Sequence, residues 1–263
     1  MAAHNSLAAK LAAEAGFGAM WVSGFELSAS YALPDASILP VSTHLAMMRA
    51  IGEAQDLPVI ADIDTGFGNA INVAYAMPRF EAAGAAAVTI EDKTFPKYSS
   101  LRSRGRHALV SIAEFQGKSA AAKASSSLLV IARTEALIAD LGEDEALRRG
   151  VAYVEAGAMH KKKTPDDILS FCRAWPGRVA LVIVPTSYPQ LSFAEVAALD
   201  KVGMIICGNH PIRAAVASMR RTFGRILEDR GIADVEQQIA PVPDILALQG
   251  DASIRALEKA YLP

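Results

Sequence analysis

Two aspartates beside glycines are the residues best suited to chemistry. Asp62 and Asp64 stand two residues apart in ADIDTGFGN (residues 61–69), at the end of an apolar run. In a β-strand both side chains would point to one face, where two like charges are tolerable if a divalent cation neutralises them. Carboxylate oxygens suit Mg²⁺ better than zinc, and glycine lets backbone approach a ligand. The pattern predicts a Mg²⁺ site, with capping of the next helix, which needs one carboxylate, as the alternative.

The next apolar run also ends in charged residues. Glu91 lies in IEDK (residues 90–93) and can join the same metal site directly or through water. Residues 93–107 (KTFPKYSSLRSRGRH) then hold five formal cations among Gly, Pro and Ser. This composition predicts a mobile lid that handles anions, and a solvated basic loop is the alternative.

Arg133 lies inside the apolar run LLVIARTEA (residues 128–136). A strand of this kind rarely carries a guanidinium without an anionic partner. The partner could be Glu135 on the same strand face, or a bound carboxylate or phosphonate, and bidentate anion recognition favours the ligand. Residues 21–26 (WVSGFE) end another apolar run and offer backbone N–H groups at a turn.

The remaining candidates give weaker signals. Asp35 lies in LPDAS, where an aspartate is typical of an ordinary turn. His160 and His210 could each donate a hydrogen bond to an anion, although lone histidines are more often structural. Cys172 and Cys207 lack basic sequence neighbours, which disfavours nucleophilic cysteine chemistry, a disulfide framework and a thiolate zinc cluster.

Apolar runs rich in β-branched residues alternate with stretches of helical period, a pattern typical of a parallel sheet. The runs lack alternation and end in polar residues, as expected for strands buried on both faces. The predicted strands are 19–24, 58–64, 86–92, 128–135, 179–186 and 202–209. The predicted helices are 6–15, 44–54, 70–83, 112–122, 143–156, 165–174, 193–198, 211–229 and 244–259.

The spacing predicts an α/β fold, a (β/α)8 TIM barrel, with a doubly wound open sheet as the alternative. No Gly-x-Gly-x-x-Gly turn follows the first strand, which disfavours the dinucleotide-binding open sheet. Residues 1–5 look like the end of a first strand, and residues 159–164 (MHKKKT) are too few for a strand and loop, so we expect residues to be missing there. We expect one barrel domain over residues 1–263, with 241–263 a C-terminal helical extension that is used in dimerisation.

Charge and hydropathy exclude several classes of partner. Lys and Arg number 26 against 28 Asp and Glu, so no basic field exists to bind nucleic acid. No run approaches the roughly 18 uninterrupted apolar residues of a membrane-spanning helix. Residues 1–9 lack the layout of a secretory signal. We therefore expect a cytoplasmic protein with a small-molecule substrate and neither nucleic-acid nor membrane partners.

Together these motifs resemble the phosphoenolpyruvate mutase/isocitrate lyase superfamily, and within it the branch of phosphonopyruvate hydrolases and phosphoenolpyruvate mutases. The resemblance covers nearly the whole chain. It rests on AAHN at 2–5, SGFELSASY at 23–31, DIDTGFGN at 62–69, EDKTFPK at 91–97, IARTEA at 131–136, VPT at 184–186 and GNHPIRAAV at 208–216.

The resemblance implies a barrel whose last helices are exchanged between the subunits of a homodimer, or of a homotetramer built as a dimer of dimers. It also implies Mg²⁺, or another divalent cation such as Mn²⁺ or Co²⁺. In this family pattern Asp62 would hold the metal directly, Asp64 and Glu91 largely through water, and Asp35 would lie close to the reacting centre.

The implied substrate is a small anionic 2-oxo acid or phosphonate. By the resemblance, Ser23, Gly24 and Phe25 would hold its pyruvyl carboxylate through hydroxyl and backbone N–H groups. Trp21 would pack against it.

The resemblance places four further residues around the phosphonyl group. Arg133 and His160 would bind it, and Lys97 and Ser99 would arrive with the lid. With Asp35, these four are the expected catalytic residues.

The lid narrows the implied reaction. It reads FPKYSS at 95–100 and lacks the cysteine of the KRCGH lid of isocitrate and methylisocitrate lyases. The position of Ser99 is Asn in the mutases and Thr in the hydrolases, so its hydroxyl favours hydrolysis. We expect metal-dependent cleavage of the P–C bond of 3-phosphonopyruvate to pyruvate and phosphate, in phosphonate catabolism.

Three alternatives stay open. The first is phosphoenolpyruvate mutase activity, which isomerises phosphonopyruvate and phosphoenolpyruvate. The second is an oxaloacetate decarboxylase or another C–C lyase of the superfamily. The third is a non-catalytic barrel that binds pyruvate-like anions. It is suggested by the short segment around His160 and by Val22, which replaces a family glycine and would add methyl groups beside the carboxylate pocket.

Overall fold

The computed structural model describes residues 1–102, 107–153, 158–160 and 165–262. The chain forms two compact units, Met1–Pro211 and Ile212–Pro263. Each unit is described by itself. The sequence-based description, one domain over 1–263 with an extension at 241–263, stays a prediction.

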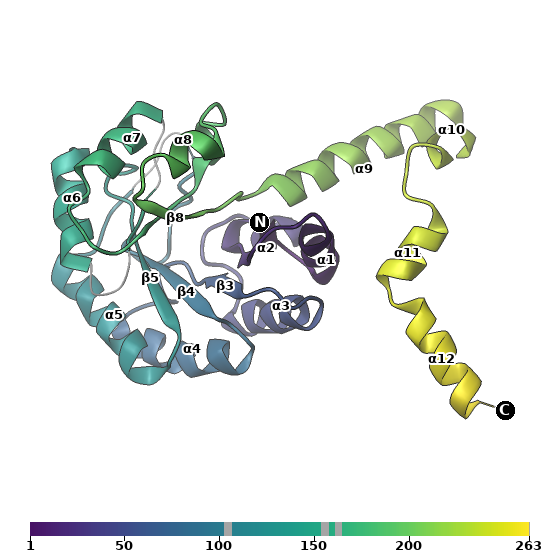
Figure 1. Cartoon of the computed structure of the whole chain (residues 1–263), viewed down its shortest axis with the longest axis horizontal. Helices are drawn as coiled ribbons and strands as arrows, with labels where there is room; N and C mark the ends of the chain where they lie inside the picture. Colours follow the sequence, from purple (N-terminus) through teal and green to yellow (C-terminus); the bar gives the residue numbers. More distant parts are fainter. Residues whose placement is uncertain (103–106, 154–157, 161–164, 263) are drawn as a thin grey trace. The chain divides into compact units, whose positions relative to one another are not determined.

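The first unit is an eight-stranded parallel barrel, as the sequence predicts (Figure 1). Each strand pairs with the next in chain order. The Ala2 N–H donates to the Cys207 carbonyl oxygen at 3.0 Å, which joins the two ends of the sheet. The strands are β1 (Ala2–Ala3), β2 (Met20–Val22), β3 (Val59–Asp62), β4 (Ala87–Glu91), β5 (Leu129–Thr134), β6 (Ala158–His160), β7 (Leu181–Ile183) and β8 (Val202–Ile205).

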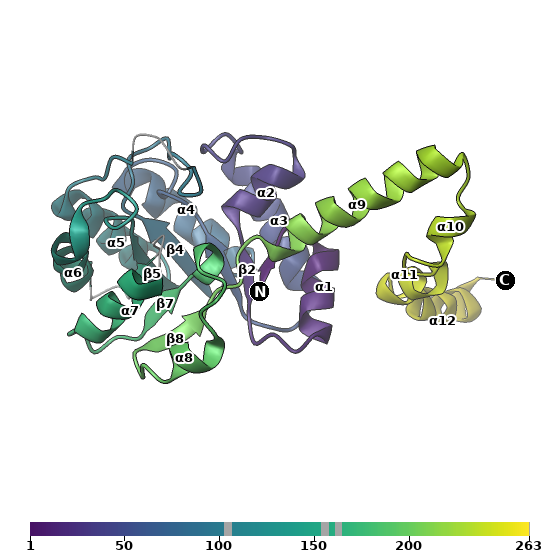
Figure 2. The ribbon, with the colours of Figure 1, turned by 90° about the horizontal axis from the view of Figure 1, so that it is seen from above.

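Helices surround the strands (Figures 1 and 2). They are α1 (Ser6–Glu14), α2 (Gly24–Ser30), α3 (Val41–Glu53), α4 (Ala70–Ala82), α5 (Ile112–Ser125), α6 (Gly142–Tyr153), α7 (Pro165–Ala174) and α8 (Phe193–Ala197). Side chains at N-caps fix several of their starts. Asn5 accepts from the Ala8 N–H, and Asn69 and Asn72 form a reciprocal capping box at α4.

The structure differs from the predicted elements in three places. β1 (Ala2–Ala3) and β6 (Ala158–His160) complete the sheet, so no strand is lost, and the expectation that residues are missing around 159–164 stays a prediction. The predicted strand 19–24 ends at Val22, because the Ser23 hydroxyl accepts from the Glu26 N–H at 3.3 Å and starts the unpredicted α2. The predicted helix 244–259 is divided at Gly250, whose φ is 78°.

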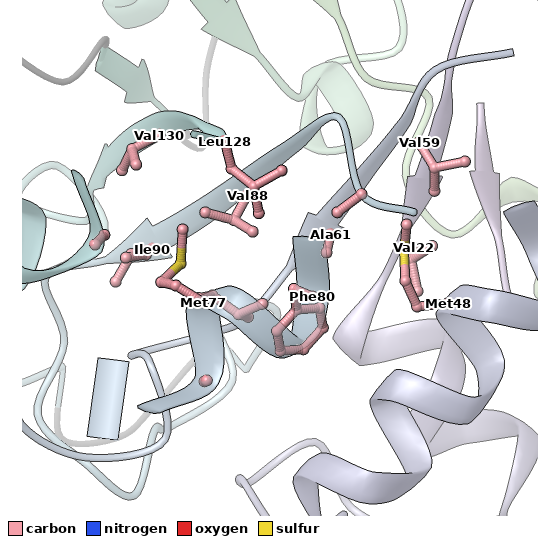
Figure 3. Close-up of a cluster of buried hydrophobic side chains, with 14 of the residues drawn as sticks. Val22, Met48, Val59, Ala61, Met77, Phe80, Val88, Ile90, Leu128 and Val130 are labelled. Carbon is pink, nitrogen blue, oxygen red and sulfur yellow. The ribbon is translucent and has the colours of Figure 1, made fainter. Parts of the chain in front are cut away.

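Alternate residues of each strand pack on opposite sides of the sheet. Trp21 and Ile131 belong to the apolar cluster inside the barrel, whereas Val22 and Ala132 belong to the cluster between strands and helices. Figure 3 shows this outer cluster, in which side chains from β2 to β5 meet Met48, Met77 and Phe80 of the helices. Apolar side chains therefore line the interior of the barrel, and the charged residues Asp62 and Glu91 lie at the carboxyl ends of their strands.

The second unit is helical. It contains most of α9 (His210–Asp229), followed by α10 (Ala233–Glu236), α11 (Val242–Leu248) and α12 (Asp251–Tyr261). Neither α11 nor α12 has a buried residue within this chain. Among the described residues, no helix combines the length and apolarity needed to cross a membrane.

The loop after β3 gives a test of the fold. Gly66 has φ +80°, and an added Cβ would lie 2.4 Å from Val73 Cγ2 of α4. The cost of a positive φ for alanine and the cost of the steric overlap should add. We therefore expect Gly66→Ala to lower the free energy of unfolding by about 2 to 4 kcal/mol in urea titrations.

Gly16→Ala is the matched control. Gly16 has φ +86° and nothing within 4 Å of an added Cβ, so only the backbone cost of about 1 kcal/mol applies. Equal losses for the two variants would show that the contact with Val73 is unimportant.

Candidate active site

The carboxyl ends of the strands enclose a small polar cavity of about 50 Å³. Active sites of TIM barrels lie at this end of the sheet. Nine predicted site residues line the cavity: Trp21, Ser23, Phe25, Asp35, Asp62, Glu91, Lys97, Ser99 and Arg133.

Asp62 and Asp64 both lie buried at the mouth of β3, with 7% and 5% of their surface exposed. Strand alternation is not what brings them together, because β3 ends at Asp62 and Asp64 has φ 53°. The chain turns instead, and the Asp64 N–H donates to Asp62 Oδ1 at 3.2 Å. Helix α4 is capped by Asn69, so the helix-capping alternative for the two aspartates is excluded.

Burial and neighbouring carboxylates raise the cost of ionising both aspartates. Burial, then the charge of Asp64, raises the pKa of Asp62 to about 7. Burial also raises the pKa of Asp64 to about 6, despite the opposing effect of Lys97. Such raised values are typical of carboxylates that share a poorly solvated site.

Lys97 of the lid lies within this acidic group. Its Nζ is 2.5 Å from both Asp35 Oδ1 and Asp64 Oδ1. Burial works against the ammonium, but these carboxylates outweigh it and hold the pKa of Lys97 well above its usual range. Burial would likewise raise the pKa of Asp35, yet Lys97 brings it below the usual value. Of the predicted lid, residues 103–106 lie outside the described residues.

Arg133 bridges two carboxylates at the end of β5. Its Nη1 is 3.2 Å from Glu91 Oε2, and its Nε donates to Glu135 Oε1 at 2.5 Å. Burial opposes the guanidinium charge, but Glu135 and Glu91 outweigh it and raise the pKa of Arg133. The Glu135 partner considered from the sequence is therefore present, and the preference for a bound anion stays a prediction.

The charged side chains named below form one cluster with a net formal charge of −2. The five carboxylates are those of Asp35, Asp62, Asp64, Glu91 and Glu135, and the three cations are Lys93, Lys97 and Arg133. Glu91 Oε1 is buried and has no hydrogen-bond partner among the described residues. A divalent cation with oxygen ligands fits both the excess charge and this oxygen.

Protein side chains would not complete such a metal's coordination. Within the described ranges, no three His, Cys, Asp or Glu side chains converge closely enough to hold an ion by themselves. Mg²⁺ usually keeps several waters and binds through one or two carboxylates. The site therefore suits a cation that is bound partly through water and substrate oxygens.

The start of α2 forms another wall of the cavity. Ser23 and Phe25 line the cavity, and the N–H groups in a helix's first turn have no intrahelical acceptor. Gly24 lies behind them, and a Cβ there would be 2.8 Å from Asp64 Oδ1. Glycine at position 24 thus lets α2 approach the acidic loop.

Two sequence-based expectations need comment. Val22 does not add methyl groups beside the cavity, because it packs outside the barrel with Met48 and Ala61 (Figure 3). This removes one argument for a non-catalytic barrel.

His160 is the last residue of β6 and pairs with Thr134 and Ile183, but its side chain lies outside what the structure describes.

The comparisons with known proteins agree with this geometry. The sequence profile of the family described as phosphoenolpyruvate phosphomutase matches residues 1–227. The chain belongs to this family. The resemblance drawn from the motifs is therefore confirmed.

Individual members of the phosphoenolpyruvate phosphomutase family match over nearly the full length. A phosphonopyruvate hydrolase from Variovorax sp. (strain Pal2) is 60% identical over 270 residues, which cover 100% of this chain and 93% of the relative. A phosphoenolpyruvate phosphomutase from Streptomyces hygroscopicus is 38% identical, with 99% and 86% covered.

Solved structures of this family superpose closely. A crystal structure of phosphonopyruvate hydrolase in complex with oxalate and Mg²⁺ has a TM-score of 0.94 at 57% identity, covering 100% of this chain and 93% of that one. A phosphoenolpyruvate phosphomutase from Streptomyces platensis subsp. rosaceus has a TM-score of 0.96 at 43% identity, with the same coverage.

Six further residues line the cavity and were not predicted from the sequence as site residues. They are Ser100, Leu101, Val184, Thr186, Gly208 and Asn209. The last four follow β7 and β8, so the rule that polar strand ends meet at one rim could have indicated them. Cys172 takes no part, since burial raises the pKa of its thiol to about 11.

The acidic cluster predicts a gain in stability when one charge is removed. The raised pKa of Asp62 means that the metal-free fold resists its ionisation. The protonated Asp62 therefore contributes to the free energy of unfolding. This contribution is fully present below the pKa of Asp62 in the unfolded chain, near pH 4, and is lost as the pH rises through the folded-state pKa of about 7. We expect Asp62→Asn to stabilise the metal-free protein by about 2 kcal/mol at about pH 8, and by less at about pH 5.

Urea unfolding with a chelator would measure this. Asp56→Asn is the control, because Asp56 is exposed and lies just before β3. We expect no change in pH dependence there. An Asp62→Asn protein less stable than wild type at the higher pH would contradict the electrostatic interpretation.

Proposed function

We propose that this protein is a metal-dependent hydrolase that cleaves the P–C bond of 3-phosphonopyruvate, releasing pyruvate and phosphate. The observation that carries the proposal is the lid residue Ser99, a hydroxyl side chain that lines the cavity together with Asp35 and Lys97. The 60% identity with a phosphonopyruvate hydrolase over the whole chain supports it.

The metal in this proposal is Mg²⁺, or a similar cation such as Mn²⁺ or Co²⁺. Asp62 would hold it directly, and Asp64 and Glu91 would hold it largely through water. When bound, such a cation supplies Lewis-acid stabilisation to the negative charge that develops on the pyruvyl oxygens. A solved phosphonopyruvate hydrolase contains Mg²⁺ with oxalate, which has the same pair of adjacent oxygen-bearing carbons as the pyruvyl end of the substrate.

The substrate would lie between α2 and β5. Ser23, Gly24 and Phe25 would receive its carboxylate, and Trp21 would pack against its carbon skeleton. At the other end Arg133, together with His160, would bind the phosphonyl group. Arg133 suits this role because its buried guanidinium stays charged and its partner Glu135 fixes its plane.

Hydrolysis also requires an oriented water. The Ser99 hydroxyl and the Lys97 ammonium would place it against phosphorus, and Asp35, whose pKa is lowered by Lys97, would accept its proton. The water oxygen bonds to phosphorus as the P–C bond breaks. The pyruvate enolate that leaves is then protonated at carbon to give pyruvate.

Phosphoenolpyruvate mutase activity is the second candidate, favoured by the TM-score of 0.96 with a phosphomutase. The mutases carry Asn at position 99, which offers an amide where this chain offers a hydroxyl. C–C lyase activity has weaker support, from 33% identity with a 2,3-dimethylmalate lyase.

Phosphorus NMR with Mg²⁺ and 3-phosphonopyruvate separates these possibilities in one sample. We expect inorganic phosphate to appear together with pyruvate. Asp62→Ala should reduce the rate by on the order of 1,000-fold, because the metal loses its direct ligand. Asp56→Ala, at an exposed position, should retain the wild-type rate.

Other spectra would redirect the assignment. Phosphoenolpyruvate as the product would make the protein a mutase. An unchanged spectrum would exclude both activities and leave oxaloacetate cleavage or a binding role. Full activity of Asp62→Ala at saturating metal would refute the metal assignment.

We further propose that the second unit mediates a homodimer by exchange of its helices, within a dimer or a dimer of dimers. Isolated helices without a buried face are marginal in water. In α9, Met219, Phe223 and Leu227 form one exposed apolar stripe, and in α12 Ile254, Leu257 and Tyr261 form another. These stripes suit burial against a second copy.

Light scattering coupled to size exclusion tests this proposal. We expect Leu257→Asp to shift the wild-type oligomer to smaller species, because a charge would be buried in the interface. Ala256→Asp places the same residue on the opposite, exposed face of α12 and should leave the assembly intact. A monomeric wild-type protein would contradict the proposal.

We also propose a cytoplasmic location. Both cysteines are free in the structure, which fits a reducing compartment.

A further inference from the structure

A second lysine lies buried beside the cavity without lining it. Lys93 follows β4, and only 1% of its surface is exposed. A buried ammonium is costly unless its charge and its N–H groups are satisfied. Its partners therefore indicate what this position requires.

The Lys93 ammonium contacts the lid and the barrel at once. Its Nζ donates to the Tyr98 carbonyl oxygen at 2.8 Å and to the Ser100 hydroxyl. It also lies 3.1 Å from Glu135 Oε2, just after β5. An ammonium has three N–H donors, and these three partners can use all of them.

Glu135 is a fixed point for these contacts. It is fully buried, and its backbone N–H donates to Asp92 Oδ1 at 2.8 Å. One carboxylate oxygen binds Arg133, and the other accepts from Ser100 Oγ at 2.7 Å and pairs with Lys93. The Ser100 hydroxyl is also 3.2 Å from Arg133 Nη2. The lid is thus connected to the guanidinium assigned to the phosphonyl group.

The two lid contacts of Lys93 flank Ser99. The root of the lid is held separately, by an antiparallel bridge between Lys93 and Leu109 and by the Thr94 N–H, which donates to the Ala108 carbonyl oxygen at 3.0 Å. These backbone bonds do not reach residues 98–100. Among the described residues, side-chain contacts of Lys93 and Ser100 tie that segment to Glu135.

We propose that Lys93 is a positioning residue that holds lid residues 98–100 against the Glu135–Arg133 pair and so places Ser99, and with it Lys97, over the reacting centre. Its effect on turnover rests on the proposed function. Its effect on the lid does not, because the contacts of Lys93 are made with protein groups alone.

Chymotrypsin cleavage after Tyr98, followed by mass spectrometry on metal-free full-length protein, tests the lid directly. Lys93→Met keeps the length of the side chain and removes the ammonium. We expect cleavage to become about 10-fold faster, because native-state cleavage follows the population of the open segment.

Lys118→Met is the matched control for loss of a buried ammonium. Lys118 is equally buried, but its Nζ donates to the Thr65 carbonyl oxygen at 3.1 Å rather than to the lid. We expect wild-type cleavage after Tyr98 in this variant. Equal acceleration in both variants would show a general loss of stability and overturn the proposal.

Steady-state kinetics give a second measurement, because a general loss of stability would not lower kcat while leaving KM nearly unchanged. Since α2 and the metal ligands still bind substrate, we expect Lys93→Met to lower kcat by about 10- to 100-fold while KM changes less than about threefold. Lys93→Arg, which restores a cation, should recover part of kcat and slow the cleavage.

Two outcomes would overturn the assignment. One is wild-type cleavage and wild-type kcat in Lys93→Met. If that variant does not fold, Ser100→Ala removes the lid side of the same contact at a partly exposed position, and unchanged cleavage after Tyr98 would refute the proposal. Faster cleavage in a protein that hydrolyses nothing would retain the role of Lys93 and reject the hydrolase instead.

Discussion

The repulsion among buried carboxylates is the constraint on which the rest of the site depends. Asp62, Asp64 and Glu91 lie together at the strand ends with almost no access to bulk water. Burial and the charges of neighbouring carboxylates oppose the ionisation of Asp62 and Asp64 and raise the pKa of both. Such a group persists only if cations approach it, so Lys97 and Arg133 must be held there by their own elements. The positions of the lid and of β5 follow from this requirement.

The barrel makes this concentration of charge possible. Parallel strands bring their carboxyl ends to one rim, and the apolar interior below is filled by residues such as Trp21 and Ile131. The polar ends of β3, β4 and β5 therefore meet above a rigid floor. The outer cluster between strands and helices is apolar as well (Figure 3). A lid that closes with ion pairs gives a dry site in which electrostatic interactions are strong.

A hydrolase and a mutase can share nearly all of this apparatus. In our proposal both would use a cation beside Asp62 and the guanidinium of Arg133, and relatives of both kinds match nearly the whole chain. The difference lies in what the lid presents to phosphorus. Here a serine hydroxyl between two anchored residues, Tyr98 and Ser100, favours a held water. The chemistry of the family thus depends on a few lid atoms, while the barrel supplies the common electrostatic frame.

The strand–helix alternation, the barrel and the residues at the strand ends could be predicted from the sequence, because apolar periodicity and polar termini are local properties of the chain. The sequence also indicated Asp62, Glu91 and Arg133 as site candidates, since charged residues in apolar runs are conspicuous. It could not determine that Asp64 reaches Asp62 by a left-handed turn, that Ser23 starts a helix, or that Val22 packs outside the barrel. Nor could it show that Lys93, one cation among five in a basic segment, is buried between lid and strand. The turn at Asp64 and the start of α2 are local, but they require one of several backbone conformations that the residue types allow, whereas the packing of Val22 and Lys93 depends on segments that lie far apart in the sequence.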